Sequence, residues 1–98
     1  EMGLIEVKIR ENEIAIFGHA GYAEPGKDIV CAGATALTET LVKSLEDLTE
    51  DEIEYEISPG WVDIQFGNLS GQGQLLVDSF FLGICLIAAD FPDHVKIL

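Results

Sequence analysis

The chain has 98 residues, a length that predicts one domain over residues 1–98, and its 48% hydrophobic content excludes a disordered tail. Five Lys and Arg residues against eighteen Asp and Glu residues give a net charge of −13, which argues against a DNA backbone or an anionic membrane as partner. A basic partner would suit this charge, although solubility alone could also explain it.

Two strands are predicted at the start of the chain. Residues 4–10 alternate between Ile or Val on one side and Glu, Lys or Arg on the other, a pattern typical of a half-buried strand. Residues 14–19 alternate in the same way, and the polar residues between the two segments can turn the chain. We therefore expect these segments to form a β-hairpin.

A loop and a helix follow this hairpin. Two glycines and a proline within residues 20–27 exclude regular structure there. Asp28 stands where a helix N-cap is expected, and apolar residues recur every three or four positions from Val30 to Leu48. This spacing predicts an amphipathic helix that begins after Asp28 and ends near Leu48.

The second half of the chain repeats the pattern. Residues 53–57 and 61–66 alternate on either side of Ser58-Pro59-Gly60, which predicts a second hairpin. Gly71-Gln72-Gly73 separates this hairpin from a predicted helix over residues 74–89. That helix is apolar nearly all round, so we expect it to be buried, with a subunit contact as one way to cover it.

Residues 95–98 could add a short last strand. The order of elements is then β-β-α-β-β-α with one further strand, and the apolar side of each helix needs a sheet to cover it. The predicted fold class is therefore α/β, a small α/β sandwich with its helices packed on a small sheet.

The start of the sequence shows no secretory signal, which leads us to expect a reducing cytoplasm and two free thiols, Cys31 and Cys85. The longest apolar stretch, residues 75–91, contains Asp78 and Asp90. We expect this stretch to be too short and too interrupted to span a membrane.

One segment brings together residues that could do chemistry. His19 ends the second predicted strand, and Cys31 falls in the first turn of the first predicted helix. The positive end of the helix should lower the thiol pKa, whereas the Asp28 carboxylate should raise it. A protonated His19 could help to form a nucleophilic thiolate, and N–H groups at the helix start could hold an oxyanion. The alternative is an inert buried Cys31 and an ordinary surface histidine.

A metal site is not expected. His19, Cys31, Cys85 and His94 could offer ligands, but the sequence lacks the short C-x-x-C and H-x-x-x-H spacings of metal sites. Cys85 lies between apolar residues of the second predicted helix, where packing is the simpler role. We therefore expect neither a metal nor a cofactor.

The segments that carry a family resemblance are Gly18-His19-Ala20, Asp28-Ile29-Val30-Cys31-Ala32 and the Gly33-Ala34-Thr35-Ala36 that follows. In residue types and separation they resemble the ribosomal-processing cysteine protease family, called Prp. The chain length and the order of predicted elements also agree with that family over essentially the whole chain.

The resemblance implies roles for individual residues. Cys31 would be the nucleophile and His19 the base. Asp28 would support the site by capping the helix or by orienting His19, with Gly18 and Thr35 as further supporting residues; Thr35 stands where the family often has Ser. A lid that orders over the substrate would be formed by the loop that contains Gly21, Tyr22, Pro25 and Gly26.

The resemblance also implies a reaction and a partner. Members of the family remove a short N-terminal extension from ribosomal large-subunit protein twenty-seven, cutting after an aromatic residue and before a small one. The precursor of that basic protein is the expected partner, and the acidic surface would help to attract it. The family is described as dimeric, which agrees with an apolar second helix. Neither direct nucleic-acid binding nor a membrane is expected.

Two other interpretations stay open. A non-catalytic binding protein that acts in ribosome assembly would use the same fold, loop and acidic surface, and it predicts that Cys31→Ser still functions. A redox-sensing thiol protein would need a resolving cysteine close to Cys31. Cys85, on a helix expected to be buried, is a poor candidate for that role.

Overall fold

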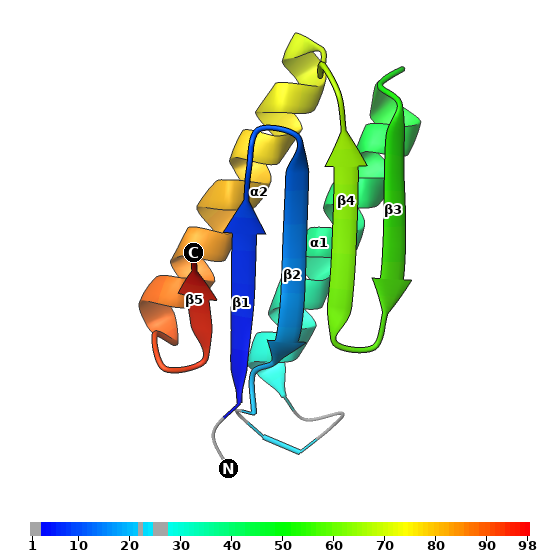
Figure 1. Ribbon diagram of the computed structural model, residues 1–98. Helices are drawn as coiled ribbons and strands as arrows, with labels where there is room; N and C mark the ends of the chain where they lie inside the picture. Colours follow the sequence, from blue (N-terminus) through cyan, green and yellow to red (C-terminus); the bar gives the residue numbers. More distant parts are fainter. Residues whose placement is uncertain (1–2, 22, 25–27) are drawn as a thin grey trace.

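The structure is a computed structural model that describes residues 3–21, 23–24 and 28–98. Seven elements follow one another along the chain (Figure 1). They are β1 (Leu4–Ile9), β2 (Glu13–His19), α1 (Ile29–Leu48), β3 (Ile53–Ser58), β4 (Trp61–Phe66), α2 (Gly71–Asp90) and β5 (Val95–Ile97). The predicted order of strands and helices, with the short last strand, is therefore confirmed.

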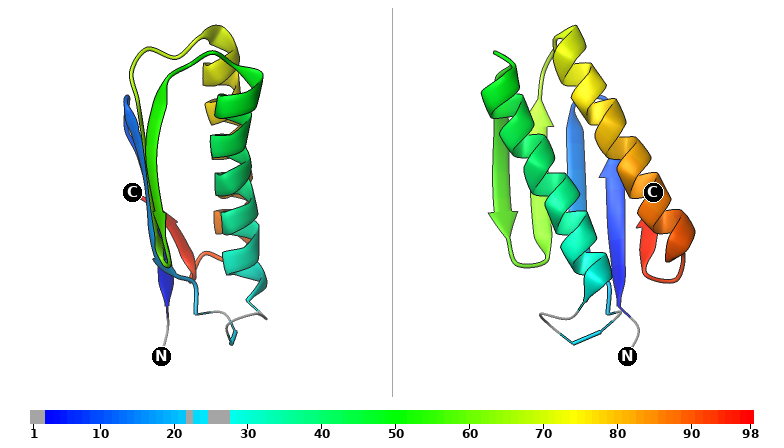
Figure 2. Two further views of the ribbon diagram at one scale, coloured as in Figure 1. Left: turned by 90° about the vertical axis from the view of Figure 1, so that its right-hand side faces the viewer. Right: turned by 180° about the vertical axis from the view of Figure 1, so that it is seen from behind.

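The strands form one five-stranded sheet in the order β3-β4-β2-β1-β5. The two predicted hairpins, β1–β2 and β3–β4, are antiparallel, β2 pairs antiparallel with β4, and β1 pairs parallel with β5. Both helices cover the same face of this sheet, so the molecule has two layers (Figure 2). This arrangement is the predicted α/β sandwich.

The hydrophobic core lies between the sheet and the helix layer. α1 presents to it most of the face that the sequence predicted, because Val30, Ala34, Leu41 and Leu45 are buried. Leu48, which the same spacing included, is 69% exposed at the end of the helix. Strands and both helices all contribute side chains with no exposed surface, among them Val7, Ile14, Leu45, Ile64 and Ile84. The core therefore fixes α1 against the sheet, and with it the position of the first turn of α1.

α2 begins earlier than predicted. The Ser70 side chain caps it by accepting a hydrogen bond from the Gly73 N–H at 3.0 Å. Ser70 is held in turn by Asp51, which accepts hydrogen bonds from its N–H and its hydroxyl at 3.0 and 2.8 Å. Gly71-Gln72-Gly73 is thus the first turn of the helix and not a linker, which corrects the prediction from sequence.

α2 is buried along one face only, which also corrects the prediction. Leu75, Leu82 and Leu86 are 65–69% exposed on its other face. By length and composition alone, with 20 residues and a mean hydropathy of 1.6, α2 could cross a membrane, a test that a helix packed in a protein core also passes. The expectation that this stretch is too short was therefore wrong. In the structure α2 packs against α1 and β5.

Candidate active site

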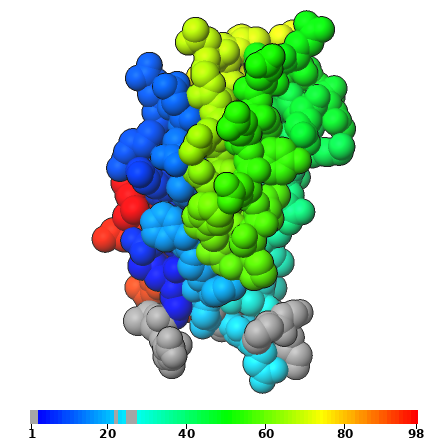
Figure 3. Space-filling model, turned by 45° about the vertical axis from the view of Figure 1, so that its right-hand side comes forward, coloured from blue at the N-terminus to red at the C-terminus, as the bar shows by residue number. Residues whose placement is uncertain are grey.

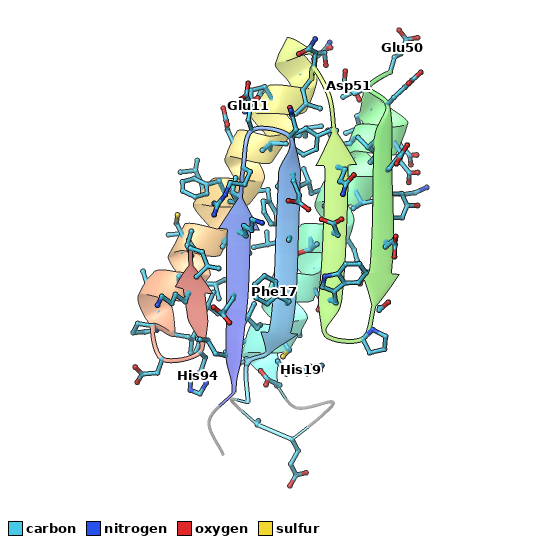
Figure 4. All side chains as sticks on the ribbon, viewed as in Figure 1. Glu11, Phe17, His19, Glu50, Asp51 and His94 are labelled. Carbon is cyan, nitrogen blue, oxygen red and sulfur yellow. The ribbon has the colours of Figure 1, made fainter. Side chains whose placement is uncertain are left out.

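Two glycines place the His19 imidazole at the end of β2. Gly18 has a φ of +100°, which favours glycine, and its N–H donates to the Gly60 carbonyl at 2.8 Å. Gly60 has a φ of +75° in the turn between β3 and β4, and a Cβ at Gly60 would lie 2.6 Å from His19 Nε2. The imidazole therefore lies against the backbone of this turn, at the lower end of the sheet (Figure 4).

The start of α1 brings Cys31 to the same end of the molecule. Asp28 caps the helix, as predicted, because its Oδ1 accepts hydrogen bonds from the N–H groups of Val30 and Cys31 at 3.0 and 2.9 Å. The Asp28 carbonyl accepts a third, from the Ala32 N–H at 3.0 Å. These three N–H groups are thus occupied in the free protein, and an oxyanion held at the helix start stays a prediction.

Ala20, the residue after His19, connects the strand to the helix. It has no exposed surface, and its N–H donates to Cys31 Sγ at 3.2 Å. Its carbonyl accepts a hydrogen bond from His94 Nδ1 at 2.7 Å. From the sequence alone, Ala20 was only part of the Gly18-His19-Ala20 motif and of the loop after it, and His94 was considered only as a metal ligand. No local sequence pattern could have indicated either contact, because each joins residues that are distant in the chain.

An apolar cavity of about 410 Å³ lies between the end of β2, the start of α1 and the β3–β4 hairpin. His19, Cys31 and Thr35 line it together with Gly18. In the space-filling view, the hairpin forms the broad surface beside β2, with the start of α1 at its lower right (Figure 3). The apolar walls of the cavity include Ile5, Ile16, Ile57, Trp61 and Val62. The sequence did not predict these walls, since they come from four strands that lie side by side only once the sheet has formed.

A larger hollow, of about 1130 Å³, lies at the opposite end of the sheet, near Glu50 and Asp51 (Figure 4). Acidic and amide side chains form much of its lining, and neither histidine nor cysteine reaches it. Of these two hollows, only the smaller one has both a cysteine and a histidine in its lining. The smaller cavity is therefore the candidate active site.

The sequence predicted opposing effects on the pKa of the Cys31 thiol, and the raising effect of Asp28 is confirmed. Burial raises the pKa of the thiol above its ordinary value, and the Ala20 N–H opposes this by lowering the pKa. Asp28 raises the pKa further, both through its charge and by accepting a hydrogen bond from the thiol. The net direction is upward, opposite to the lowering predicted from the helix start. The thiol is therefore mainly protonated in the free protein at neutral pH.

The structure brings most of the predicted site residues together. Gly18, His19, Cys31 and Thr35 line one cavity, and Asp28 lies beside it through its contacts with Cys31. Within the described part of the chain, His19 and Cys31 make no direct hydrogen bond with each other. The free protein thus holds the two groups at one cavity without pairing them.

Other predicted residues lie elsewhere. Both cysteines are free, as expected, and Cys85 lies on α2. Gly21, from the predicted lid, is exposed after the end of β2. Among residues 3–21, 23–24 and 28–98, no group of three or more His, Cys, Asp or Glu side chains could hold a metal ion. The lid residues that lie outside the described part of the chain are Tyr22, Pro25 and Gly26.

The site contains the groups that a thiol hydrolase needs: a cysteine and a histidine that line one apolar cavity. The model of one protein family, described as cysteine protease Prp, matches residues 4–96, nearly the whole chain. The fold and the site are therefore those of a cysteine protease. The chain belongs to the Prp family of cysteine proteases.

Individual relatives agree with this assignment. The chain is 29% identical over 87 residues to the ribosomal processing cysteine protease Prp of Bacillus subtilis (strain 168), covering 82% of this chain and 78% of that protein. It is 26% identical over 88 residues to the protein of the same name from Staphylococcus aureus (strain Mu50 / ATCC 700699), covering 87% and 83%. Its fold is similar to that of a crystal structure of S. aureus Prp with a covalently linked product peptide, with a TM-score of 0.87, 21% identity and coverage of 98% and 97%.

The first prediction concerns the charge of Asp28. We expect Asp28→Asn to make iodoacetamide alkylate Cys31 several-fold faster at pH 7, because asparagine still caps a helix but lacks the charge that raises the thiol pKa. The pH–rate profile of Cys31 should shift to lower pH. Peptide mapping by mass spectrometry separates Cys31 from Cys85. Asp78→Asn, at an exposed position on α2, is the matched control and should leave the profile unchanged.

The His19 imidazole lies against the Gly60 backbone, where only a glycine leaves room for it. A Cβ at Gly60 would displace the imidazole, so we expect Gly60→Ala to slow peptide cleavage about tenfold or more. The unfavourable φ should also lower the free energy of unfolding by about 1–2 kcal/mol. Gly67→Ala, where a Cβ meets nothing within 4 Å, should change neither quantity. Full activity of Gly60→Ala would contradict this account of how His19 is placed.

Proposed function

We propose that this protein is an endopeptidase that removes the N-terminal extension from the precursor of ribosomal large-subunit protein twenty-seven, with Cys31 as nucleophile and His19 as base. The observation that carries the proposal is that His19 and Cys31 line one apolar cavity in a chain of the Prp family. The names of the B. subtilis and S. aureus relatives support a substrate from the ribosome. The cytoplasm, where ribosomes assemble, is the proposed location.

The apolar lining of the cavity favours a substrate with an aromatic side chain next to the cleaved bond. Ile57, Val62 and Trp61 supply apolar walls beside Cys31, and aromatic rings gain strongly from such burial. Thr35, on the same cavity, adds a hydroxyl that can hydrogen-bond to the substrate backbone. The net charge of −13 would attract a basic ribosomal protein, an effect that weakens as salt increases.

The mechanism follows from these positions. His19 takes the thiol proton, and the Cys31 sulfur attacks the carbonyl carbon to give a tetrahedral oxyanion. We assign the Ala20 N–H to this oxyanion, because it already points at the sulfur while Asp28 occupies the helix-start donors. His19 then gives its proton to the leaving amine. Water, deprotonated by His19, hydrolyses the thioester and restores the thiol.

The raised pKa of the Cys31 thiol supports a site that becomes active when substrate binds. In the free protein the thiol keeps its proton and the exposed His19 is not hydrogen-bonded to it. A peptide seated in the cavity would exclude water and bring the two groups within reach of each other. We assign the loop between β2 and α1, the lid suggested by the sequence, to this closure.

Cleavage of a peptide that spans the N-terminal extension tests the proposal. We expect the wild type to make one cut after an aromatic residue, Cys31→Ala to make none, and His19→Ala to cut at least about a hundredfold more slowly. Cys85→Ala, which removes the other thiol, is the matched control and should cut normally. The products are identified by mass spectrometry.

Two outcomes would decide against the proposal. Cleavage by Cys31→Ala would contradict the role of the thiol. An intact peptide with every variant, bound equally tightly by the wild type and by Cys31→Ser, would favour the non-catalytic protein of ribosome assembly. Cleavage at another bond of the peptide would support protease activity but contradict the proposed specificity.

We also propose a homodimer that covers the exposed face of α2. Leu75, Leu82 and Leu86 are 65–69% exposed along one side of that helix, and burying such a stripe is favourable. We expect Leu82→Glu to convert a dimer into a monomer in sedimentation velocity at micromolar concentration. Leu48→Glu, at an equally exposed position on α1, should leave the dimer intact. A wild type that is monomeric at high concentration would contradict the dimer.

A further inference from the structure

His94 reaches the active site from the other end of the chain. It lies 74 positions after Ala20, in the turn between α2 and β5, and its Nδ1 is 2.7 Å from the Ala20 carbonyl oxygen. A carbonyl oxygen can only accept a hydrogen bond, so His94 Nδ1 carries the proton and donates it. Figure 4 places the two histidines at the same end of the sheet.

The backbone around His94 is fixed on both sides. Its N–H donates to the Phe91 carbonyl at 2.9 Å, and its own carbonyl accepts a hydrogen bond from the Ile5 N–H of β1 at 2.9 Å. Val95, the next residue, begins β5 beside β1. The backbone that carries the His94 ring is thus held by β1 and by the end of α2.

Ala20 has little freedom between its two partners. It has no exposed surface, and a buried carbonyl without a hydrogen bond would be costly. Gly3 packs so closely on this segment that a Cβ at Gly3 would lie 2.9 Å from the Ala20 carbonyl carbon. The carbonyl is bound by His94 and the N–H by the Cys31 sulfur. The two groups belong to adjacent peptide units that are joined at the Ala20 Cα. With Ala20 buried and both units hydrogen-bonded, a change at the carbonyl is passed to the N–H through the backbone torsions of Ala20.

We propose that His94 is a positioning residue for the protease reaction: by holding the Ala20 carbonyl, it keeps the Ala20 N–H aimed at the Cys31 sulfur. This inference rests on the proposed role of Cys31 as nucleophile. His94 touches no reacting atom in it, and acts through Ala20. The N–H that it aims stabilises the thiolate and, during the reaction, the oxyanion.

The expected loss of Cys31 reactivity depends on which groups stabilise its thiolate and which destabilise it. Burial and Asp28 both disfavour the Cys31 thiolate, and the Ala20 N–H is the group that favours it. Loosening one hydrogen bond to an anion should therefore slow reactions of Cys31 with iodoacetamide at pH 7 by roughly tenfold. Cys85, on α2, should be unaffected and serves as a reference within the same molecule.

Three variants of His94 test the proposal. His94→Asn keeps a side-chain N–H at about the reach of Nδ1, His94→Gln moves that donor farther out, and His94→Leu removes it. We expect His94→Asn to retain most of the Cys31 alkylation rate and of kcat, and the other two to lose about tenfold in both with little change in KM. Rates are measured as the ratio of Cys31 to Cys85 labelling, well below each melting temperature.

Alkylation needs no substrate, so it separates this inference from the proposed function. Wild-type and His94→Gln profiles that superimpose over pH would overturn the role of His94, whatever the protein cleaves. A loss that is equal for His94→Asn, His94→Gln and His94→Leu would also overturn it, because a general structural defect would then explain the result. Cleavage by Cys31→Ala would instead remove the proposed function while the alkylation result stood.

Discussion

The hydrogen bond from the Ala20 N–H to the Cys31 sulfur is the contact on which the active site depends. β2 belongs to the sheet and α1 to the helix layer, so neither element alone sets the position of His19 relative to Cys31. Ala20 directly follows His19, and its bond to the thiol fixes the end of β2 against the start of α1. Gly18 and the Gly60 turn then direct the imidazole toward the shared cavity.

Stability and reactivity oppose each other at Asp28. The same carboxylate that caps α1 also raises the pKa of the Cys31 thiol, and partial burial of the sulfur acts in the same direction. A neutral thiol in the free protein avoids an uncompensated buried charge and limits reaction with small electrophiles. In the proposed mechanism, activation therefore depends on the bound substrate, which supplies the carbonyl and excludes water when His19 takes the proton.

Local patterns predicted most of the fold, and tertiary contacts decided the rest. Strand alternation gave both hairpins, and Asp28 with the apolar spacing behind it gave the start of α1. The start of α2 was missed because the Ser70 cap depends on Asp51, which is distant in sequence. The effect of Asp28 on the thiol pKa was predicted, but the larger effect of burial was missed, since burial arises only when both layers pack.

The central claim is that Cys31 is the nucleophile of a cavity that accepts an aromatic residue. A peptide chloromethyl ketone that ends in phenylalanine tests it most directly, because this electrophile reacts fastest when its ring occupies the cavity beside the nucleophile. The account predicts one adduct, located on Cys31 by mass spectrometry, that forms more slowly in His19→Ala and is blocked by the substrate peptide. Equal labelling of Cys31 and Cys85, unaffected by that peptide, would contradict the account.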